Sequence, residues 1–158
     1  MIAFVEIQPI YINAVFEILS EVSIELWGLS LNDLRSIDPL SDLNDPGNYY
    51  RSHGGVFMVI LDDDHVVGMG GILGGDDGIC ELKRIFLRKE FRGRGLGKGL
   101  VMKLLGFAAD HGCEKARLEV ATPDIQSQAI GLYTHLGFTE IPCYRTGSCS
   151  YAMEKDLF

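Results

Sequence analysis

The sequence predicts a mixed α/β domain built around one sheet. Three strand-like segments follow one another at residues 56–61, 65–73 and 79–88, separated by short polar turns. A glycine-rich turn comes next and leads directly into an amphipathic helix. From there to residue 154 strand-like and helical segments alternate, without the repeat of a doubly wound fold. Because the chain has 158 residues, we expect a single domain over residues 1–158.

The N-terminal third is predicted to hold a strand and one or two helices. Residues 2–7 read as a strand, and Pro9 is suited to the first turn of a helix whose apolar residues then recur at helical spacing up to Leu19. Residues 22–50 have no clear period. We expect a helix over residues 26–37 and then a loop, because Pro and Asp residues become frequent.

The central and C-terminal parts have clearer patterns. The turn at residues 62–64 joins the first two strands of the triplet into a hairpin. The helix after the glycine-rich turn is expected over residues 96–112, and a second helix over 125–136. Between them, residues 116–120 read as a short central strand. Strands over residues 139–143 and 150–154 are expected to complete the sheet.

Composition places the protein among soluble globular domains. Hydrophobic residues make up 47% and charged residues 23% of the chain. The first residues do not combine a basic segment with a long apolar run, and no stretch of about 18 apolar residues occurs. We therefore expect no signal peptide, no membrane partner and a cytoplasmic location.

The four cysteines, Cys80, Cys113, Cys143 and Cys149, contain no C-x-x-C pair. This spacing argues against a zinc site, and no metal is expected. In a chain without a secretory signal, lone cysteines are expected to be reduced and partly buried.

Charge is unevenly distributed along the chain. The formal net charge is −8, which argues against nucleic acid as a partner. Eight of the 14 Lys and Arg residues nevertheless lie in one short segment: Lys83, Arg84, Arg88, Lys89, Arg92, Arg94, Lys98 and Lys103. Such a segment is either a solvated face or, because it includes the glycine-rich turn, an anion-binding site.

The glycine-rich turn carries the chemical signal. Gly93, Gly95, Gly97 and Gly99 occupy every second position just before and within the start of a helix. Glycine allows positive φ and close approach of a ligand, and the first turn of a helix offers unpaired N–H groups and a partial positive charge. The combination suits a phosphate or pyrophosphate. The alternative is that the glycines only permit a tight strand-to-helix turn.

Two nucleotide-binding patterns do not fit this turn. The pattern G-x-x-x-x-G-K-[ST] fails, because Arg92 stands five positions before Gly97 and Lys98 is followed by glycine. The pattern G-x-G-x-x-G fails as well, because Leu100 stands where its last glycine belongs. A nucleotide-hydrolysing or dinucleotide-binding protein is therefore not expected.

The motifs resemble those of the GNAT family of N-acetyltransferases. Arg92-x-x-Gly95-x-Gly97 is similar to that family's R/Q-x-x-G-x-G/A signature, and residues 81–87 resemble its fourth strand. Further on, the run from Ala129 to Phe138 resembles its A-x-x-L-Y-x-x-x-G-F motif. The resemblance covers about residues 56–155. It implies a twisted, mostly antiparallel sheet of six to seven strands, flanked by about four helices and splayed between the fourth and fifth strands at a bulge.

The resemblance also implies how acetyl-CoA is bound as co-substrate. The pantetheine arm would lie between the splayed strands and pair with the backbone of Ile85, Phe86 and Leu87. Gln126 stands where the family often has an asparagine that contacts the arm. The pyrophosphate would sit on the turn, with Arg92 closing it; the residues implied there are Arg92, Gly93, Arg94, Gly95, Leu96, Gly97 and Lys98.

Two catalytic residues are implied by position in the family's motifs. Glu81 would act as general base, directly or through water, on the amine that attacks the thioester. Its alternative role is a salt bridge with a Lys or Arg. Tyr133 would protonate the leaving thiolate, and its alternative role is that of a core tyrosine. A backbone N–H near Phe86 would stabilise the oxyanion.

The acceptor is implied to be selected by residues 22–53 and 139–151. Acidic residues in the first segment would favour a cationic amine, or they only solvate an acidic protein. They are Glu25, Asp33, Asp38, Asp42 and Asp45, near the aromatic residues Trp27, Tyr49 and Tyr50. Arg51 or Arg145 would instead hold an acceptor carboxylate.

The predicted activity is therefore transfer of acetyl from acetyl-CoA to a primary amine of a small molecule or peptide. The transfer is expected to be direct, in a ternary complex, because no cysteine matches a nucleophile position of the family. The alternative is a catalytically silent acyl-CoA-binding or sensor module of the same fold. A homodimer is compatible with the family but is not indicated by the residues.

Overall fold

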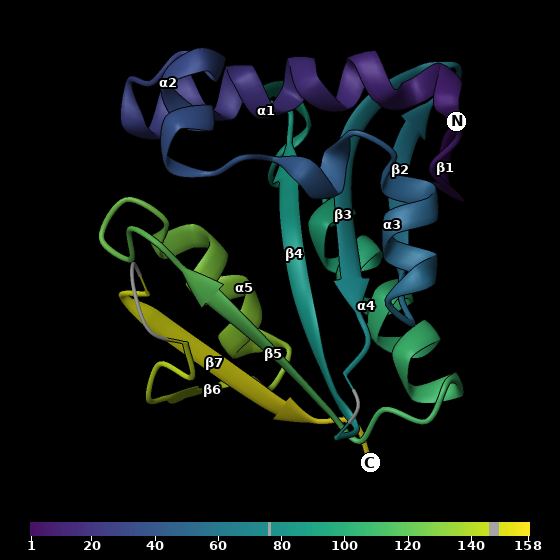
Figure 1. Ribbon diagram of the computed structural model, residues 1–158, viewed down its shortest axis with the longest axis vertical. Helices are drawn as coiled ribbons and strands as arrows, with labels where there is room; N and C mark the ends of the chain where they lie inside the picture. Colours follow the sequence, from purple (N-terminus) through teal and green to yellow (C-terminus); the bar gives the residue numbers. More distant parts are fainter. Residues whose placement is uncertain (76, 146–148) are drawn as a thin grey trace.

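The structure, a computed structural model, describes residues 1–75, 77–145 and 149–158. Seven strands of these residues form one sheet in the order β1-β2-β3-β4-β5-β7-β6 (Figure 1). All neighbouring strands are antiparallel except β4 and β5, which are parallel. The strands are β1 (Ile2–Glu6), β2 (Val56–Asp62), β3 (His65–Leu73), β4 (Ile79–Leu87), β5 (Lys115–Val120), β6 (Thr139–Ile141) and β7 (Tyr151–Asp156).

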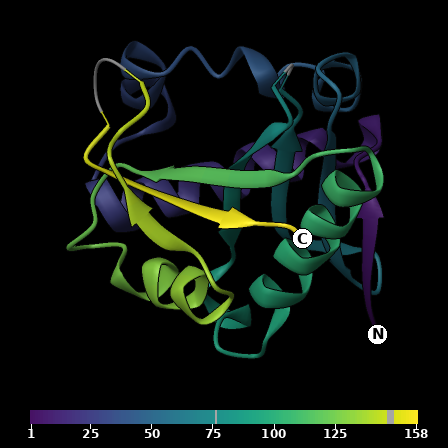
Figure 2. The same cartoon turned by 90° about the horizontal axis from the view of Figure 1, so that it is seen from below.

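Helices cover both faces of the sheet. They are α1 (Ile12–Trp27), α2 (Leu31–Ile37), α3 (Pro46–Ser52), α4 (Leu96–Asp110) and α5 (Ser127–His135). One apolar core lies between the sheet and the pair α4 and α5, and a second lies between the sheet and α1, α2 and α3. Figure 2 shows α4 and α5 together on one side of the sheet, with the first three helices on the other. No helix in the described ranges is long and apolar enough to cross a membrane.

The sheet opens between β4 and β5. These strands pair only from Ile79 and Lys115 to Glu81 and Arg117, after which they diverge toward α1 and α2 (Figure 1). The register of β3 against β4 shifts between Met69 and Gly71. Opposite this shift Arg84 has a φ of 62°, so a bulge turns the second half of β4 away from β5. The predicted mixed α/β fold with its splay is confirmed.

The predicted helix over residues 26–37 is wrong. The chain leaves α1 at Gly28, whose φ of 65° forms a left-handed C-cap, and α2 begins after Ser30. Ser30 and Asp33 form a capping box that starts the new helix. The loop expected before residue 50 also contains α3, which Asp45 caps by accepting a hydrogen bond from the N–H of Asn48.

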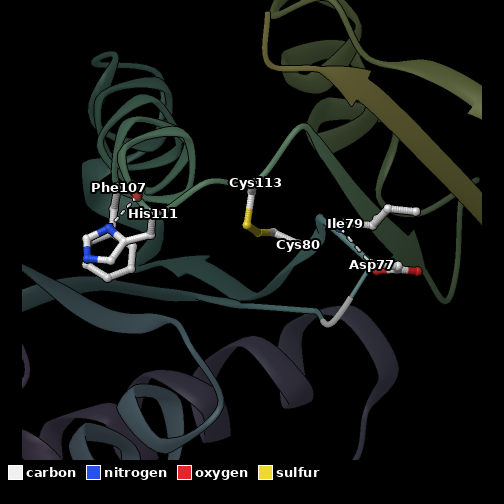
Figure 3. The surroundings of a disulfide bond; sticks show 6 residues. All are labelled: Asp77, Ile79, Cys80, Phe107, His111 and Cys113. Atoms are coloured by element: carbon white, nitrogen blue, oxygen red, sulfur yellow. Dashed lines mark hydrogen bonds between the residues drawn. A yellow bond between two sulfur atoms is a disulfide. The ribbon is translucent and has the colours of Figure 1, made fainter.

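The expectation of reduced cysteines is also wrong. Cys80 at the start of β4 and Cys113 before β5 form a disulfide across 33 residues of sequence (Figure 3). They meet because β4 and β5 begin side by side as a parallel pair. Cys143 and Cys149 form a second disulfide, which closes part of the connection from β6 to β7. The pairing of Cys80 with Cys113 has no local sequence signal, because it depends on where β5 returns beside β4.

Candidate active site

Two cavities lie on either side of the splay. One, of about 570 Å³, is bounded by the glycine-rich turn, the second half of β4 and α5. The other, of about 450 Å³, is bounded by β4, β5, the end of α1, the chain after α2 and the chain after β6. They share five wall residues: Ile85, Phe86, Gln126, Ala129 and Tyr133. We refer to them as the donor cavity and the acceptor cavity.

The glycine-rich turn forms one end of the donor cavity. Gly93 and Gly95 have φ values of 76° and 78°, and Gly95 is the N-cap of α4. The first backbone hydrogen bond of this helix runs from the N–H of Gly99 to the carbonyl of Gly95 at 3.0 Å. The N–H groups before Gly99 therefore have no helical acceptor, and the helix dipole adds positive potential there. Gly93, Gly95, Gly97 and Lys98 line the cavity, as expected for an anion site.

Arg92 fixes the turn to two other elements. Its guanidinium donates to the carbonyl of Leu87 at 3.1 and 3.2 Å, which ties the turn to the end of β4. It also donates to the carboxylate of Glu25 in α1 at 2.7 and 2.9 Å. These hydrogen bonds hold the pKa of Glu25 below its usual value. The charge of Arg92 is thus largely neutralised by Glu25. The backbone N–H groups of the turn are therefore the main hydrogen-bond donors left for an anion.

Arg94 and Leu96 are placed differently from the other predicted donor-site residues. Among the described residues, the walls of the donor cavity do not include either side chain. The guanidinium of Arg94 lies 5.0 Å from the centre of the Phe91 ring. Leu96 packs against the core beneath α4. Only the backbone of these two residues belongs to the turn.

The rest of the donor cavity is formed by β4, by α5 and the residues before it, and by Val22 and Leu26 of α1. Ile85, Phe86 and Leu87 line it beyond the point where pairing with β5 stops, so one edge of β4 is left open there. The side-chain oxygen of Gln126 accepts hydrogen bonds from the N–H and hydroxyl of Thr122 at 3.1 and 2.7 Å. The indole N–H of Trp27 donates to the same hydroxyl at 3.0 Å. The amide nitrogen of Gln126 is thus the atom that can face a ligand.

Tyr133 lies at the junction of the two cavities. It lines both, and its side chain is almost fully buried. Its ring packs edge-on against Phe138 with 5.6 Å between ring centres. Burial raises the pKa of Tyr133, so the phenol is protonated at neutral pH. The two roles predicted for this residue, core packing and proton donation, are therefore compatible.

Glu81 lies in the acceptor cavity and already has two partners. The hydroxyl of Tyr144 donates a 2.6 Å hydrogen bond to its carboxylate, and Arg145 forms an ion pair with it. The ring of Tyr144 is held in turn by the guanidinium of Arg117, which lies 3.8 Å from the ring centre. Burial and the hydrogen bond to Glu81 raise the pKa of Tyr144. The salt bridge that the sequence left open for Glu81 is present.

The acidic residues predicted to attract a cationic acceptor have internal partners instead. Arg84 forms ion pairs with Asp38 at 2.7 Å and with Asp42 at 2.9 Å, and Asp42 also accepts a 2.7 Å hydrogen bond from Tyr50. Glu25 pairs with Arg92, as described above. Asp33 and Asp45 cap α2 and α3. The acidic residues of this segment therefore serve the fold more than they form a charged rim.

Arg51 and Arg145, the two candidates for binding an acceptor carboxylate, lie in different surroundings. Arg51 donates to Glu6 at 2.6 and 2.8 Å, and among the described residues it is not part of the acceptor cavity wall. Arg145 lines that cavity. Glu119 of β5 also lines it and was not predicted from the sequence. Polar and apolar residues alternate along β5, so the polar side chains lie on one face of the strand. This alternation was the sequence signal that could have identified Glu119.

The sequence is similar to those of known N-acetyltransferases. Residues 12–138 match the acetyltransferase (GNAT) family. The chain is 31% identical over 152 residues to an uncharacterized N-acetyltransferase, YjgM, of Escherichia coli (strain K12), covering 91% of this chain and 88% of YjgM. It is 38% identical over 104 residues to human N-acetyltransferase 8B, covering 62% of this chain and 45% of the human protein.

Solved structures share the fold at low sequence identity. A GNAT-family acetyltransferase of Staphylococcus aureus superposes with a TM-score of 0.85 at 20% identity, over the whole of both chains. The PaiA N-acetyltransferase of Thermoplasma acidophilum, crystallised with coenzyme A, superposes with a TM-score of 0.81 at 20% identity, over 99% of both chains.

The splayed sheet, the glycine-rich turn and the two cavities define an acyltransferase of the N-acetyltransferase class. The match over residues 12–138 and the relationship to YjgM show that the chain belongs to the GNAT family. The resemblance stated from the sequence motifs is confirmed.

Proposed function

We propose that the protein transfers the acetyl group of acetyl-CoA directly to a primary amine of a small molecule or peptide. The observation that carries the proposal is the position of Tyr133, a protonated phenol in the wall shared by the donor and acceptor cavities. A proton donor at this junction can reach a thiolate that forms between the two cavities. The coenzyme A complexes of fold relatives support acetyl-CoA as the donor.

The donor cavity offers matching groups for each part of acetyl-CoA. The turn from Gly93 to Lys98 offers N–H donors and a lysine to the pyrophosphate. The open edge of β4 at Ile85–Leu87 offers backbone groups to the amides of the pantetheine arm. Gln126 is proposed to donate to the same arm. Arg92 contributes by holding the turn against β4, as its hydrogen bonds to Leu87 indicate.

In the proposed reaction the amine nitrogen attacks the thioester carbonyl, and the bond between carbon and sulfur breaks. We assign stabilisation of the oxyanion to a backbone N–H near Phe86. Tyr133 gives its proton to the leaving thiolate. The amine proton leaves through water toward Glu81, whose oxygens are held by Tyr144 and Arg145. Direct proton abstraction by Glu81 would require these two donors to move away.

Thiol release from acetyl-CoA, measured with a panel of primary amines, tests the proposal. We expect at least one amine to accelerate release by the wild type, and Tyr133→Phe to slow that release while coenzyme A binding is retained. If coenzyme A binds but no amine on a broad panel accelerates release, the alternative of a silent acyl-CoA-binding module is the correct one.

A further inference from the structure

Glu119 places a second carboxylate in the acceptor cavity. It lies on β5, two residues after Arg117. Arg117 is the residue that stands opposite Glu81 in the parallel pairing of β4 and β5. Ala116, Leu118 and Val120 face the core under α4 and α5, so Glu119 points to the opposite face of the strand. Only 23% of its side chain is exposed. Glu81, Glu119 and Arg145 thus meet in the wall of one cavity.

One oxygen of Glu119 has no hydrogen-bond partner. Among the described residues, its Oε1 is the side-chain atom that is buried without a donor. The nearest cation is Arg145, whose Nε lies 3.7 Å away, beyond hydrogen-bond distance. A buried carboxylate oxygen without a donor is unfavourable, because it has lost water and gained nothing in return. Because the Glu119 side chain lines the cavity and is partly exposed, rotation of its carboxylate would bring this oxygen to a hydrogen-bond donor of a ligand there.

The charges of the cavity show which ligand would provide it. Arg145 is the cation that lies between the two carboxylates, and its hydrogen bonds go to Glu81. Glu119 is thus left without a full counter-charge. Its complement is a group that is both positively charged and a hydrogen-bond donor, as an ammonium group is. Because both carboxylates lie within 4 Å of nitrogens of one guanidinium, two amino groups of one short molecule can approach both.

We propose that Glu119 is a specificity-determining residue that binds a second ammonium group of the acceptor, so that the preferred acceptors are short diamines. This inference rests on the proposed function, since it assigns the reacting amine to the side of Tyr133 and Glu81. The second amino group is bound by Glu119 and takes no part in the transfer. Glu119 therefore affects the binding of the acceptor and leaves the chemical step unchanged.

The test compares 1,4-diaminobutane with butylamine, which has the same chain length and lacks the second amino group. With the wild type we expect a KM for the diamine about tenfold lower or more, because a site built for a charged donor rejects an analogue without it. In Glu119→Gln the KM for the diamine should rise about tenfold and approach that for butylamine. The kcat for both amines and the KM for butylamine should stay as in the wild type.

Glu140→Gln is the matched control, because Glu140 lies exposed on β6 of the same sheet. It should leave all four constants unchanged. An equal KM for the two amines with the wild type would overturn the inference. So would a fall in kcat for both amines in Glu119→Gln, since that would place Glu119 in the chemical step. A preference for amines that carry a carboxylate, lost in Arg145→Gln, would also overturn it.

Calorimetric titration of 1,4-diaminobutane into the protein saturated with coenzyme A separates this inference from the proposed function. If no amine is acetylated but the diamine binds the wild type and binds Glu119→Gln at least tenfold more weakly, recognition by Glu119 stands and acetyl transfer fails. If the diamine binds both proteins equally, or binds neither, the assignment of Glu119 is wrong.

Discussion

The hydroxyl of Tyr144 donates a 2.6 Å hydrogen bond to the carboxylate of Glu81, although 63 residues separate them. Tyr144 lies in the connection from β6 to β7. Arg145 reaches the same carboxylate from the same connection. The end of the sheet thus closes one side of the acceptor cavity and sets the hydrogen bonding of the proposed base.

Tyr133→Phe should lower kcat by about 100-fold or more, because general acid catalysis contributes on that order. The fold should be retained, since the ring still packs against Phe138. Steady-state kinetics and a coenzyme A binding titration measure the two effects. Tyr151→Phe, at a tyrosine among the described residues outside both cavity walls, is the control and should keep full activity. An unchanged kcat in Tyr133→Phe would rule out the proton-donor role.

Because burial raises the pKa of Tyr133, its phenol should also stay protonated at mildly alkaline pH. An ordinary tyrosine begins to lose its proton near pH 10. The pH profile of kcat should therefore show no loss of the acid up to about pH 10. A fall in kcat with an apparent pKa of about 8 that disappears in Tyr133→Phe would contradict this expectation.

Arg84→Met should destabilise the protein by about 3 to 5 kcal/mol, the usual effect of leaving a buried charge without its partner. The uncompensated charge would be Asp42, whose side chain is 8% exposed. Arg88→Met, four positions later, removes ion pairs to the exposed Glu17 and Glu21 and should cost only about 1 kcal/mol. Urea denaturation of the three proteins measures the difference. Equal losses in the two variants would refute the special role of Arg84.

The Arg84 cluster also predicts how stability depends on pH. Burial acts to raise the pKa of Asp38 and of Asp42, but the hydrogen bonds and charge of Arg84 outweigh it and hold both below their ordinary values. Both carboxylates therefore stabilise the fold above about pH 4 and lose that contribution as the pH falls through their lowered pKa values. The free energy of unfolding should therefore drop as the pH falls below about 4. In Arg84→Met the drop should be smaller.

Gly95→Ala should weaken acetyl-CoA binding several-fold and lower the free energy of unfolding by about 1 to 2 kcal/mol. The reason is that an alanine side chain is strained at a φ of 78°. Gly106→Ala is the control, since Gly106 lies exposed inside α4 with helical backbone and space for a methyl group. It should gain about 0.5 to 1 kcal/mol and bind acetyl-CoA normally. Binding titrations and thermal unfolding check both variants.

The two disulfides predict that the protein, unfolded without reductant, reacts with no thiol reagent, because all four cysteines are paired. Reduction should cost more stability at Cys80–Cys113 than at Cys143–Cys149, because the first bond closes a loop of 33 residues and the second a loop of 6. The expected loss for the first is about 3 to 4 kcal/mol. Mass spectrometry after alkylation counts the free thiols. Labelling of Cys80 without reductant would show that this bond is absent.

The helix boundaries show where local sequence was sufficient and where it was not. The start of α4 at Leu96 was predicted correctly, because the glycines and the apolar period both mark it. The boundary between α1 and α2 was placed wrongly, because residues 22–50 show no clear period and the C-cap at Gly28 and the capping pair Ser30 and Asp33 were not recognised. Caps of this kind act through single hydrogen bonds, which a periodicity argument does not detect.

By itself the sequence determined the family and predicted the donor site, because the groups proposed to hold a pyrophosphate and a pantetheine arm come from short contiguous segments. The turn from Arg92 to Lys98 and the motif around Tyr133 each keep their spacing within one strand-to-helix unit or one helix. Only the tertiary structure decided the acceptor side. Arg145 reaches Glu81 across 64 residues, and Cys80 reaches Cys113 across 33. The assignment of Glu119 depends on the absence, within the described part of the chain, of a hydrogen-bond donor beside its Oε1. Such an absence is visible only in the tertiary structure, because it depends on all the groups that surround the atom.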